Sequence, residues 1–256
     1  KREKGYMKTE EFLKLLCGKD VMRVLDSYRD VIGLLFPDII PCIGFDQKSK
    51  YHIYDVWEHI IHSVSAAPQD PEIRMALFLH DIGKPSCATF DERGGHFYGH
   101  GETGAEMSRK ILDGMKLPRN FCDAVYMLVK YHDYPLDASE KTVRRRLARF
   151  GESFLRKLCT VQRADAAGHG TKTDAVFEKI DATQAMIDKI VALNACFSLR
   201  DLAINGNDLY AMGVQKGPQM KYLLNKALSA VVDDEVKNDR QELEKYVRSI
   251  IDKQPI

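Results

Sequence analysis

The amino-acid sequence predicts an all-α protein with one small β-hairpin, and three observations support this fold class. Apolar residues recur at helical spacing along most of the 256 residues. Proline and glycine fall mostly between these stretches, where helices begin and end. Strand-like alternation is confined to residues 87–98. The apolar runs are all much shorter than the ~20 residues that a membrane-spanning helix needs, so we expect no membrane segment.

In the first hundred residues, cap and breaker residues set the expected helix boundaries. Thr9 is expected to cap a short helix that ends at Gly18, because a Thr side chain can accept hydrogen bonds from the first free N–H groups. Pro37 is expected to end the second helix, and Pro71 to open a buried one. In chain order we expect helices at 9–17 and 21–36, an extended connector at 37–41, helices at 52–66 and 71–83, and a hairpin with strands at 87–90 and 96–98.

The remaining residues are predicted to be helical throughout. The expected helices lie at about 101–112, 119–131, 140–149, 154–167, 174–193, 206–212, 220–232 and 237–252, the short sixth one capped by residues 205–208. The sequence has no internal repeat or low-complexity tract. We therefore divide it into an N-terminal helical segment (1–45), a central domain (46–170) that contains the hairpin, and a C-terminal helical segment (171–256).

Composition excludes several classes of protein. Hydrophobic residues make up 45% and charged residues 29%, which is typical of a globular chain and not of a disordered or fibrous one. The 38 basic and 37 acidic residues leave a net charge of +1, so no overall field would attract nucleic acid. The six scattered cysteines suit reduced thiols in the cytoplasm. The first residues have neither an initiator Met nor an apolar signal core, which predicts the interior of a longer chain or a trimmed one.

Histidines and acids recur on or beside the predicted buried helices. A lone polar ring or carboxylate there would be unfavourable unless it is paired or bound to metal. A mixed set of imidazoles and carboxylates suits Mn, Fe, Ni, Co, Zn or Mg ions that activate water for hydrolysis. An adjacent His-Asp pair at a helix end can hold one ion from two sides and leave a carboxylate oxygen to bridge a second. The candidate ligands of one or two divalent ions are His59, His80, Asp81, His100, His132 and Asp165.

The order of these residues resembles the HD superfamily of metal-dependent phosphohydrolases. The resemblance implies that His59, His80, Asp81 and Asp165 hold a first ion. It also implies that two further histidines, at 100 and 132, hold a second ion with Asp81 as the bridge. Asp81 would then be catalytic, and Lys84 would face the substrate phosphate. The alternative for Lys84 is a solvated cation favoured by a helix C-terminus.

A narrower resemblance covers almost the whole chain. Residues 28–31, 43–47, 51–59, 96–100, 205–209 and 217–218 are similar to strings in bacterial tRNA nucleotidyltransferases, the CCA-adding enzymes and their poly(A) polymerase relatives. The similarity extends only to that family's C-terminal part, so 1–45 would be body, 46–170 the HD domain and 171–256 the tail. The family's head, with Gly-Gly-x-x-Arg and Asp-x-Asp motifs, is missing. Because nucleotidyl transfer needs paired carboxylates for Mg²⁺, we expect no CCA addition by this chain alone.

Three functions follow as alternatives. The first is hydrolysis of nucleotide or RNA-end phosphates, such as 2′,3′-cyclic phosphates or phosphomonoesters, by metal-activated hydroxide. The second is a tRNA-binding portion of a CCA-adding enzyme without hydrolase activity. The third is a (p)ppGpp or deoxynucleotide triphosphate hydrolase. The expected partner is a nucleotide or tRNA, without a membrane, and a homo-oligomer stays open.

Other residues have a structural explanation beside a functional one. Arg144, Arg145 and Arg146 form the strongest basic run, either a track for RNA phosphates or a solvated helix face. Asp133 either orients the imidazole of His132 or faces water. His62 is expected to lie outside the ligand layer or to be a partly buried polar residue, rather than a ligand. His52 and His96 either contact substrate or are structural, and we favour the structural role; His169 is expected to belong to a loop.

Overall fold

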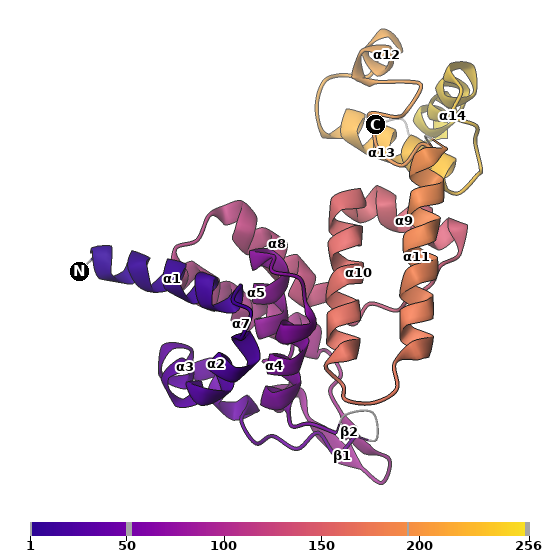
Figure 1. Ribbon diagram of the computed structural model, residues 1–256. Coiled ribbons are helices and arrows are strands. Elements are labelled where there is room, and N and C mark those ends of the chain that lie inside the picture. The colour runs from indigo at the N-terminus through magenta and orange to yellow at the C-terminus, as the bar shows by residue number, and fades with distance from the viewer. Residues whose placement is uncertain (1, 50–52, 194, 254–256) are drawn as a thin grey trace. The chain divides into compact units, whose positions relative to one another are not determined.

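The computed structural model describes residues 2–49, 53–193 and 195–253, with side chains over 9–49, 53–193 and 195–252. Within these ranges the chain is helical apart from turns, loops and one two-stranded antiparallel hairpin, which confirms the predicted all-α class (Figure 1). Contacts divide the chain into two compact units. Unit 1 comprises residues 1–135 and 156–180, and unit 2 comprises residues 136–155 and 181–256. The boundaries after 45 and 170 follow sequence motifs rather than contacts, and they stay a prediction.

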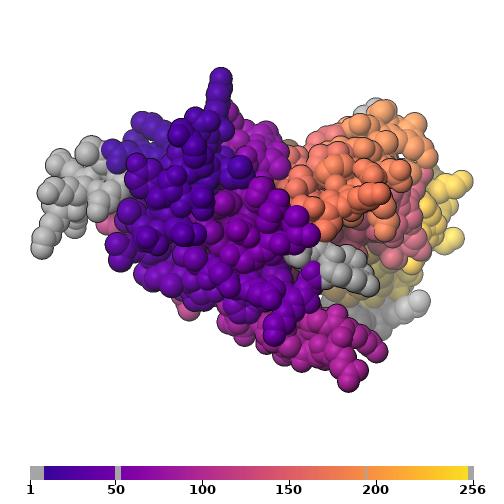
Figure 2. All heavy atoms as spheres, turned by 60° about the horizontal axis from the view of Figure 1, so that its bottom comes forward, coloured from indigo at the N-terminus to yellow at the C-terminus, as the bar shows by residue number. Residues whose placement is uncertain are grey.

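The N-terminal helices of unit 1 differ from the prediction at three points. Helix α1 (Arg2–Leu16) begins before Thr9, whose hydroxyl donates to the carbonyl of Met115 instead of capping a helix. The stretch at 21–36 is two helices, α2 (Val21–Ser27) and α3 (Arg29–Leu35), because the backbone turns at Tyr28. The expected extended connector is a 3-10 helix, η1 (Pro37–Cys42), since proline suits the first turn of a helix. Figure 2 shows the side chains of this indigo segment packed as a continuous layer over one face of unit 1.

An aromatic cluster holds these N-terminal helices against the centre of unit 1. The ring of Phe12 lies 4.7 Å from that of Phe36 and 5.1 Å from that of Phe78, measured between centroids. Trp57 packs edge-on against Phe78 at 6.4 Å. Burial of such large rings accounts for much of the apolar area that this unit removes from water.

The central helices of unit 1 begin where the sequence places strong caps. Asp55 and Glu58 form a capping box at the start of α4 (Val56–Ala66), and Asp70 caps α5 (Pro71–Leu79). A short helix, α6 (Lys84–Cys87), was not predicted. The hairpin pairs β1 (Thr89–Asp91) with β2 (Gly94–His96), Thr89 opposite His96. Two packed helices follow, α7 (His100–Met115) and α8 (Arg119–Tyr131), close to their predicted positions.

Unit 2 has a core of its own. It contains α9 (Glu140–Phe150), α12 (Gly206–Ala211), α13 (Pro218–Val232) and α14 (Arg240–Lys253), each near a predicted helix. The helices α10 (Glu152–Ala167) and α11 (Asp174–Ala192) each run through a boundary between the units. Leu209, Leu223, Leu243 and Val247 are among the fully buried residues of the core.

No helix in the described part of the chain is long and apolar enough to cross a bilayer.

Candidate metal centre

Four helices and the segment after the hairpin bring the predicted ligands together inside unit 1. His59 lies in the second turn of α4, and Asp165 near the end of α10. His80 and His132 each follow the last residue of a buried helix, α5 and α8, with helical backbone angles. His100 is the first residue of α7. The five positions and Asp81 are distant in sequence, but their side chains converge.

Four of these side chains form a first group around one centre. The Nε2 atom of His59 lies 3.0 Å from the Nε2 atom of His80 and 2.9 Å from Oδ1 of Asp165. The Oδ2 atom of Asp81 lies 3.3 Å from both of these Nε2 atoms. The His80 and Asp165 atoms are 3.4 Å apart. Ligand atoms around an ion with bonds of about 2.0–2.1 Å are separated by about 3.0 Å in an octahedron and about 3.4 Å in a tetrahedron, so the group fits one ion.

The other oxygen of Asp81 faces a second group. Its Oδ1 atom lies 3.5 Å from Nε2 of His100 and 3.7 Å from Nε2 of His132. The two imidazole nitrogens are 3.1 Å apart. Asp81 therefore lies between two sets of ligands, one at each oxygen. This is the arrangement that a carboxylate bridging two ions would require.

Hydrogen bonds to the backbone set the orientation of all four imidazoles. The Nδ1 atoms of His80, His100 and His132 contact the carbonyls three residues earlier, at 2.6, 2.8 and 2.7 Å. That of His59 contacts the carbonyl of Gly168 at 3.1 Å. A carbonyl can only accept, so each Nδ1 carries the proton, and in a neutral ring the lone pair of Nε2 points into the cluster. Facing lone pairs about 3 Å apart repel unless a cation lies between them, and carbonyl-oriented imidazoles are typical of metal ligands.

Two glycines permit the close packing that this arrangement needs. A Cβ atom on Gly83 would lie 2.5 Å from the carbonyl oxygen of His100, so the His-Asp turn could not pack on the start of α7. A Cβ atom on Gly168 would lie 2.1 Å from Oγ of Ser63 and 2.9 Å from its backbone nitrogen. Gly168 must approach α4 this closely because its carbonyl orients His59.

Burial and charge act against each other on the ionisable groups. Burial lowers the pKa of His80, but the charge of Asp81 and the bond to Asp165 outweigh it and raise the pKa to about 10. Burial raises the pKa values of the two carboxylates. The charges of His80 and Lys84 nevertheless hold the pKa of Asp81 well below its usual range, and the contact with His169 and the charge of His80 do the same for Asp165. Burial lowers the pKa of His59, and burial with the charge of His80 lowers that of His132 to about 4. The raised pKa of His80 favours a positive charge beside both carboxylates, whose oxygens lie 3.3 and 3.4 Å from its Nε2 atom.

Both oxygens of Asp81 are buried, and neither accepts a hydrogen bond of ordinary geometry from the described residues. The Nζ atom of Lys84 lies 2.7 Å from Oδ2 of Asp81 and donates to Oε1 of Gln47 at 2.9 Å. The predicted role of Lys84 as a free contact for substrate phosphate therefore competes with its contact to Asp81. Gln47, which the sequence analysis did not single out, in turn donates to the carbonyl of Tyr54 at 3.1 Å.

A cavity of 440 Å³ opens beside the cluster. Its lining includes Asp81, His100, His132 and Asp165, with Asp133 and His169. The Nε2 atom of His169 lies 3.5 Å from Oδ1 of Asp165, so this histidine belongs to the site rather than to an uninvolved loop. The i,i+4 spacing from Asp165 is the signal that could have found it. Asp133 lines the cavity, and Nδ1 of His132 bonds to the carbonyl of Val129, so of the two alternatives for Asp133 the orienting role at this nitrogen is taken by the backbone.

The other candidates lie outside the cluster. Arg144 pairs with Asp234 at 2.6 Å and Arg145 with Asp233 at 2.6 Å, both within unit 2. Arg146 lies on the same helix, and RNA binding by the three arginines stays a prediction. His62 stacks on Tyr54 with ring centroids 4.2 Å apart. His52 lies outside the described residues.

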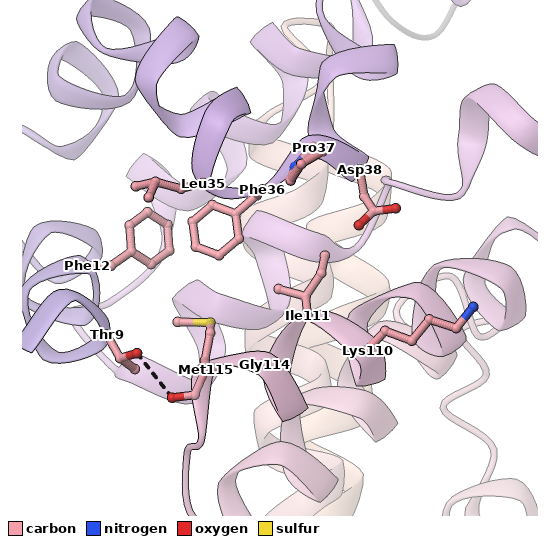
Figure 3. Close-up of a pocket in the computed structure, with 10 residues that line it drawn as sticks. All are labelled: Thr9, Phe12, Leu35, Phe36, Pro37, Asp38, Lys110, Ile111, Gly114 and Met115. Carbon is pink, nitrogen blue, oxygen red and sulfur yellow. Dashed lines mark hydrogen bonds between the residues drawn. The ribbon is translucent and has the colours of Figure 1, made fainter. Parts of the chain in front are cut away.

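A second cavity of unit 1 has a different character. Figure 3 shows that its walls are mainly apolar side chains of α1, α7 and the start of η1, among them Phe12, Phe36 and Ile111. Its volume is 360 Å³, and Asp38 and Lys110 are the charged residues in its lining. Its lining contains no histidine.

The sequence profile of the tRNA nucleotidyltransferase domain 2 family matches residues 101–247, more than half of the chain. The chain belongs to this tRNA nucleotidyltransferase family. The match includes α7 to α13 and the candidate ligands His132 and Asp165. The match does not extend to the HD superfamily, so membership of that superfamily stays a prediction.

Two tRNA nucleotidyltransferases align with most of the chain. A CC-adding tRNA nucleotidyltransferase of Thermus thermophilus is 28% identical over 89% of this chain and 52% of its own length. An A-adding tRNA nucleotidyltransferase of Deinococcus radiodurans is 28% identical over 84% of this chain and 51% of its own length. The chain spans about half the length of these curated relatives. A bifunctional uridylyltransferase/uridylyl-removing enzyme of Cereibacter sphaeroides is 29% identical over 43% of the chain and 13% of its own length.

Proposed function

We propose that this chain is a tRNA-binding helical portion of a tRNA nucleotidyltransferase. The alignment with CC- and A-adding enzymes over 89% and 84% of the chain carries this proposal. The basic face of α9 supplies a candidate contact for RNA phosphates, which give most of the affinity in nucleic-acid binding. Part of this face is accessible, since the side chain of Arg145 is 56% exposed.

Binding of a full-length tRNA at several salt concentrations tests the proposal. We expect Arg145→Ala to weaken binding and to reduce its salt dependence by about one counterion. Asp233→Asn is the matched control, because it removes the same ion pair but leaves the arginine free. Equal loss of affinity in both variants would show that Arg145 acts only through folding. Equal affinity for tRNA and for an unstructured RNA of the same length would contradict the proposal as a whole.

A second function, metal-dependent hydrolysis of a phosphoester in the manner of the HD superfamily, is favoured by one observation. Four Nε2 atoms face one another and the carboxylates of Asp81 and Asp165 at ligand–ligand distances, and the Nδ1 atom of each of these four imidazoles bonds to a carbonyl. This donor set suits divalent ions that prefer nitrogen and oxygen ligands, with Mn, Fe, Co, Ni and Zn as candidates. His59, His80, Asp81 and Asp165 would hold the first ion, and His100 and His132 the second.

The protein residues then have defined tasks. Bound divalent ions would lower the pKa of water and neutralise charge on phosphoryl oxygens. Asp81 would bind both ions, and the carbonyl bonds would keep the imidazoles in place. Lys84 would keep its contact with Asp81 or turn toward a phosphate in the cavity that it lines.

Elemental analysis and turnover test this second function. We expect the purified chain to retain transition metal and to cleave bis-p-nitrophenyl phosphate or 2′,3′-cyclic AMP. The double variant His80→Ala, Asp81→Ala should lose both properties. His62→Ala, an imidazole on the same helix as His59 but stacked on Tyr54, should keep both. Equal metal content in the double variant and the unchanged chain would remove the site, and bound metal without turnover would leave only the tRNA-binding function.

A further inference from the structure

Two parallel aromatic rings lie at the cavity beside the histidine cluster. The rings of His96 and Tyr98 have centroids 5.7 Å apart and planes inclined by only 3°. Both residues line the 440 Å³ cavity together with Asp81 and His100. Tyr98 is 83% exposed, more than any other large hydrophobic side chain in the described part of the chain. An exposed ring at the edge of a polar cavity, parallel to a neighbouring ring, can stack on the flat face of a ligand that enters the cavity.

The support for the two rings comes from the hairpin. Asp91 contacts Nε2 of His96 across the strands at 3.0 Å, and this contact lowers the pKa of Asp91. The backbone N–H of Gly95 donates to the carbonyl of Lys48 at 3.1 Å, which ties β2 to the segment that carries Gln47. His96 is therefore held in place by contacts on its own strand pair. The ring of Tyr98 therefore lies beside an imidazole, that of His96, whose position is set by the hairpin.

The turn between the hairpin and α7 keeps Tyr98 close to the histidine cluster. Tyr98 lies two residues before His100, so their Cα atoms are at most about 7 Å apart. The carbonyl of Phe97 accepts from both the backbone nitrogen and Nδ1 of His100, at 3.1 and 2.8 Å. One short turn thus supplies both a candidate metal ligand and an exposed aromatic ring. A ligand with a phosphate at the cluster would have its next few atoms beside Tyr98.

We propose that Tyr98, supported by His96, is a stacking platform for the nucleobase of an unpaired nucleotide whose phosphate lies at the histidine cluster. Every base has a π face, so stacking on one aromatic ring accepts different bases. A base inside a duplex is stacked on its neighbours and cannot reach such a ring, so the substrate class is a mononucleotide or a single-stranded RNA end. The position of the phosphate rests on the proposed hydrolase function, whereas base stacking can be measured without turnover.

The experiment compares two cyclic phosphodiesters on the full metal-loaded chain. One is 2′,3′-cyclic AMP, and the other is glycerol 1,2-cyclic phosphate, which has the same ring phosphate without a base. For Tyr98→Ala we expect kcat/KM to fall about 10-fold or more on 2′,3′-cyclic AMP, mainly through KM, and by less than about 2-fold on the glycerol compound. Tyr98→Phe is the matched control, because it keeps the ring and removes only the hydroxyl, and it should retain activity on both.

Binding of AMP, measured by calorimetry, separates this inference from the proposed hydrolase function. If the unchanged chain cleaves neither compound but binds AMP, and Tyr98→Ala weakens that binding by about 10-fold while Tyr98→Phe does not, the platform stands and hydrolysis fails. A loss in Tyr98→Ala that is equal for the compounds with and without a base overturns the platform. So does unchanged kcat/KM on 2′,3′-cyclic AMP in Tyr98→Ala, or an unchanged chain that neither cleaves nor binds any of the nucleotides.

Discussion

Each histidine of the cluster is oriented by the backbone carbonyl that its Nδ1 atom meets, and the position of that carbonyl in the sequence differs among them. His80, His100 and His132 bond to the carbonyl three residues earlier, so a helix end or tight turn orients each of them locally. His59 differs, because its partner is the carbonyl of Gly168, far away in sequence. The orientation of this one imidazole therefore depends on tertiary packing.

Gly168→Ala tests that dependence. Its Cβ atom would meet the backbone of Ser63 at 2.9 Å, which a side-chain rotation cannot relieve, so the Gly168 carbonyl must move away from His59. We expect metal affinity to fall about 10- to 100-fold, as for other losses of a group that orients a ligand. Competition with a chelator measures it. Gly114→Ala, where a Cβ atom meets nothing within 4 Å, is the control, and unchanged affinity in a folded Gly168→Ala protein would contradict the prediction.

A buried thiol in unit 2 gives a prediction about pH. Burial, with the charge of Asp201, raises the pKa of Cys196 from the ordinary thiol value of 9.0 to about 11. A pKa that is raised in the folded state contributes stability that is complete below pH 9 and is lost as the pH rises through 11. We expect iodoacetamide to modify Cys196 slowly in the folded chain at pH 9 and rapidly in urea at the same pH. Peptide mass spectrometry measures both rates, and equal rates would show that the thiol is not protected.

At the scale of elements, the cap of α4 links local sequence to the site. Oδ1 of Asp55 accepts from the backbone of Glu58 at 2.7 Å, and Oδ2 accepts from the backbone of Gly44 at 3.0 Å. We expect Asp55→Ala to lower the free energy of unfolding by about 1–2 kcal/mol, because a cap and a second bond are both lost. Asp55→Asn keeps one carbonyl acceptor and should lose less. Urea unfolding compares the two, and equal losses would contradict this account.

Sequence patterns predicted the elements best where caps were strong. Pro71 and the residues at 205–208 placed the starts of α5 and α12 correctly, because a cap or an N-terminal proline acts within one helical turn, whereas α5 ends at Leu79 and not near Gly83 as expected. The break at Tyr28 had no proline or glycine to mark it, so α2 and α3 were predicted as a single helix. Thr9 looked like a cap, but its hydroxyl bonds to Met115, more than a hundred residues away. Long-range partners of this kind leave no local signal.

The same limit applies to the site. The six candidate ligands could be named from residue type and order, and the structure brings their side chains together. Gln47 could not be named, because its bond to Lys84 depends on how the segment before α4 folds back. The stack of His96 and Tyr98 likewise depends on the pairing of two short strands. Chemistry-bearing residue types are visible in a sequence, whereas their supporting contacts require the fold.

At the scale of the whole molecule, the candidate ligands all belong to one of the two compact units. They range from residue 59 to residue 165. Residues 136–155 fall within this range but belong to unit 2, and they supply no candidate ligand. An ion at this place would link α4, α5, α8 and the end of α10. Because an ion that binds only the folded form shifts the equilibrium toward it, its stabilising effect should be confined to unit 1.

Hydrogen exchange with and without Mn²⁺ or Zn²⁺ tests this prediction. At an ion concentration 100 times the Kd, stability should rise by about 2.7 kcal/mol, so amides that exchange through opening of unit 1 should slow about 100-fold. Amides of α4, α5 and α8 should respond, while those of α13 and α14, with the separate core of Leu223 and Leu243, should not. The variant His80→Ala, Asp81→Ala should show no response in either unit. Equal slowing in both units would mean that they open together or that the ion binds elsewhere, because a ligand protects only the parts whose opening releases it.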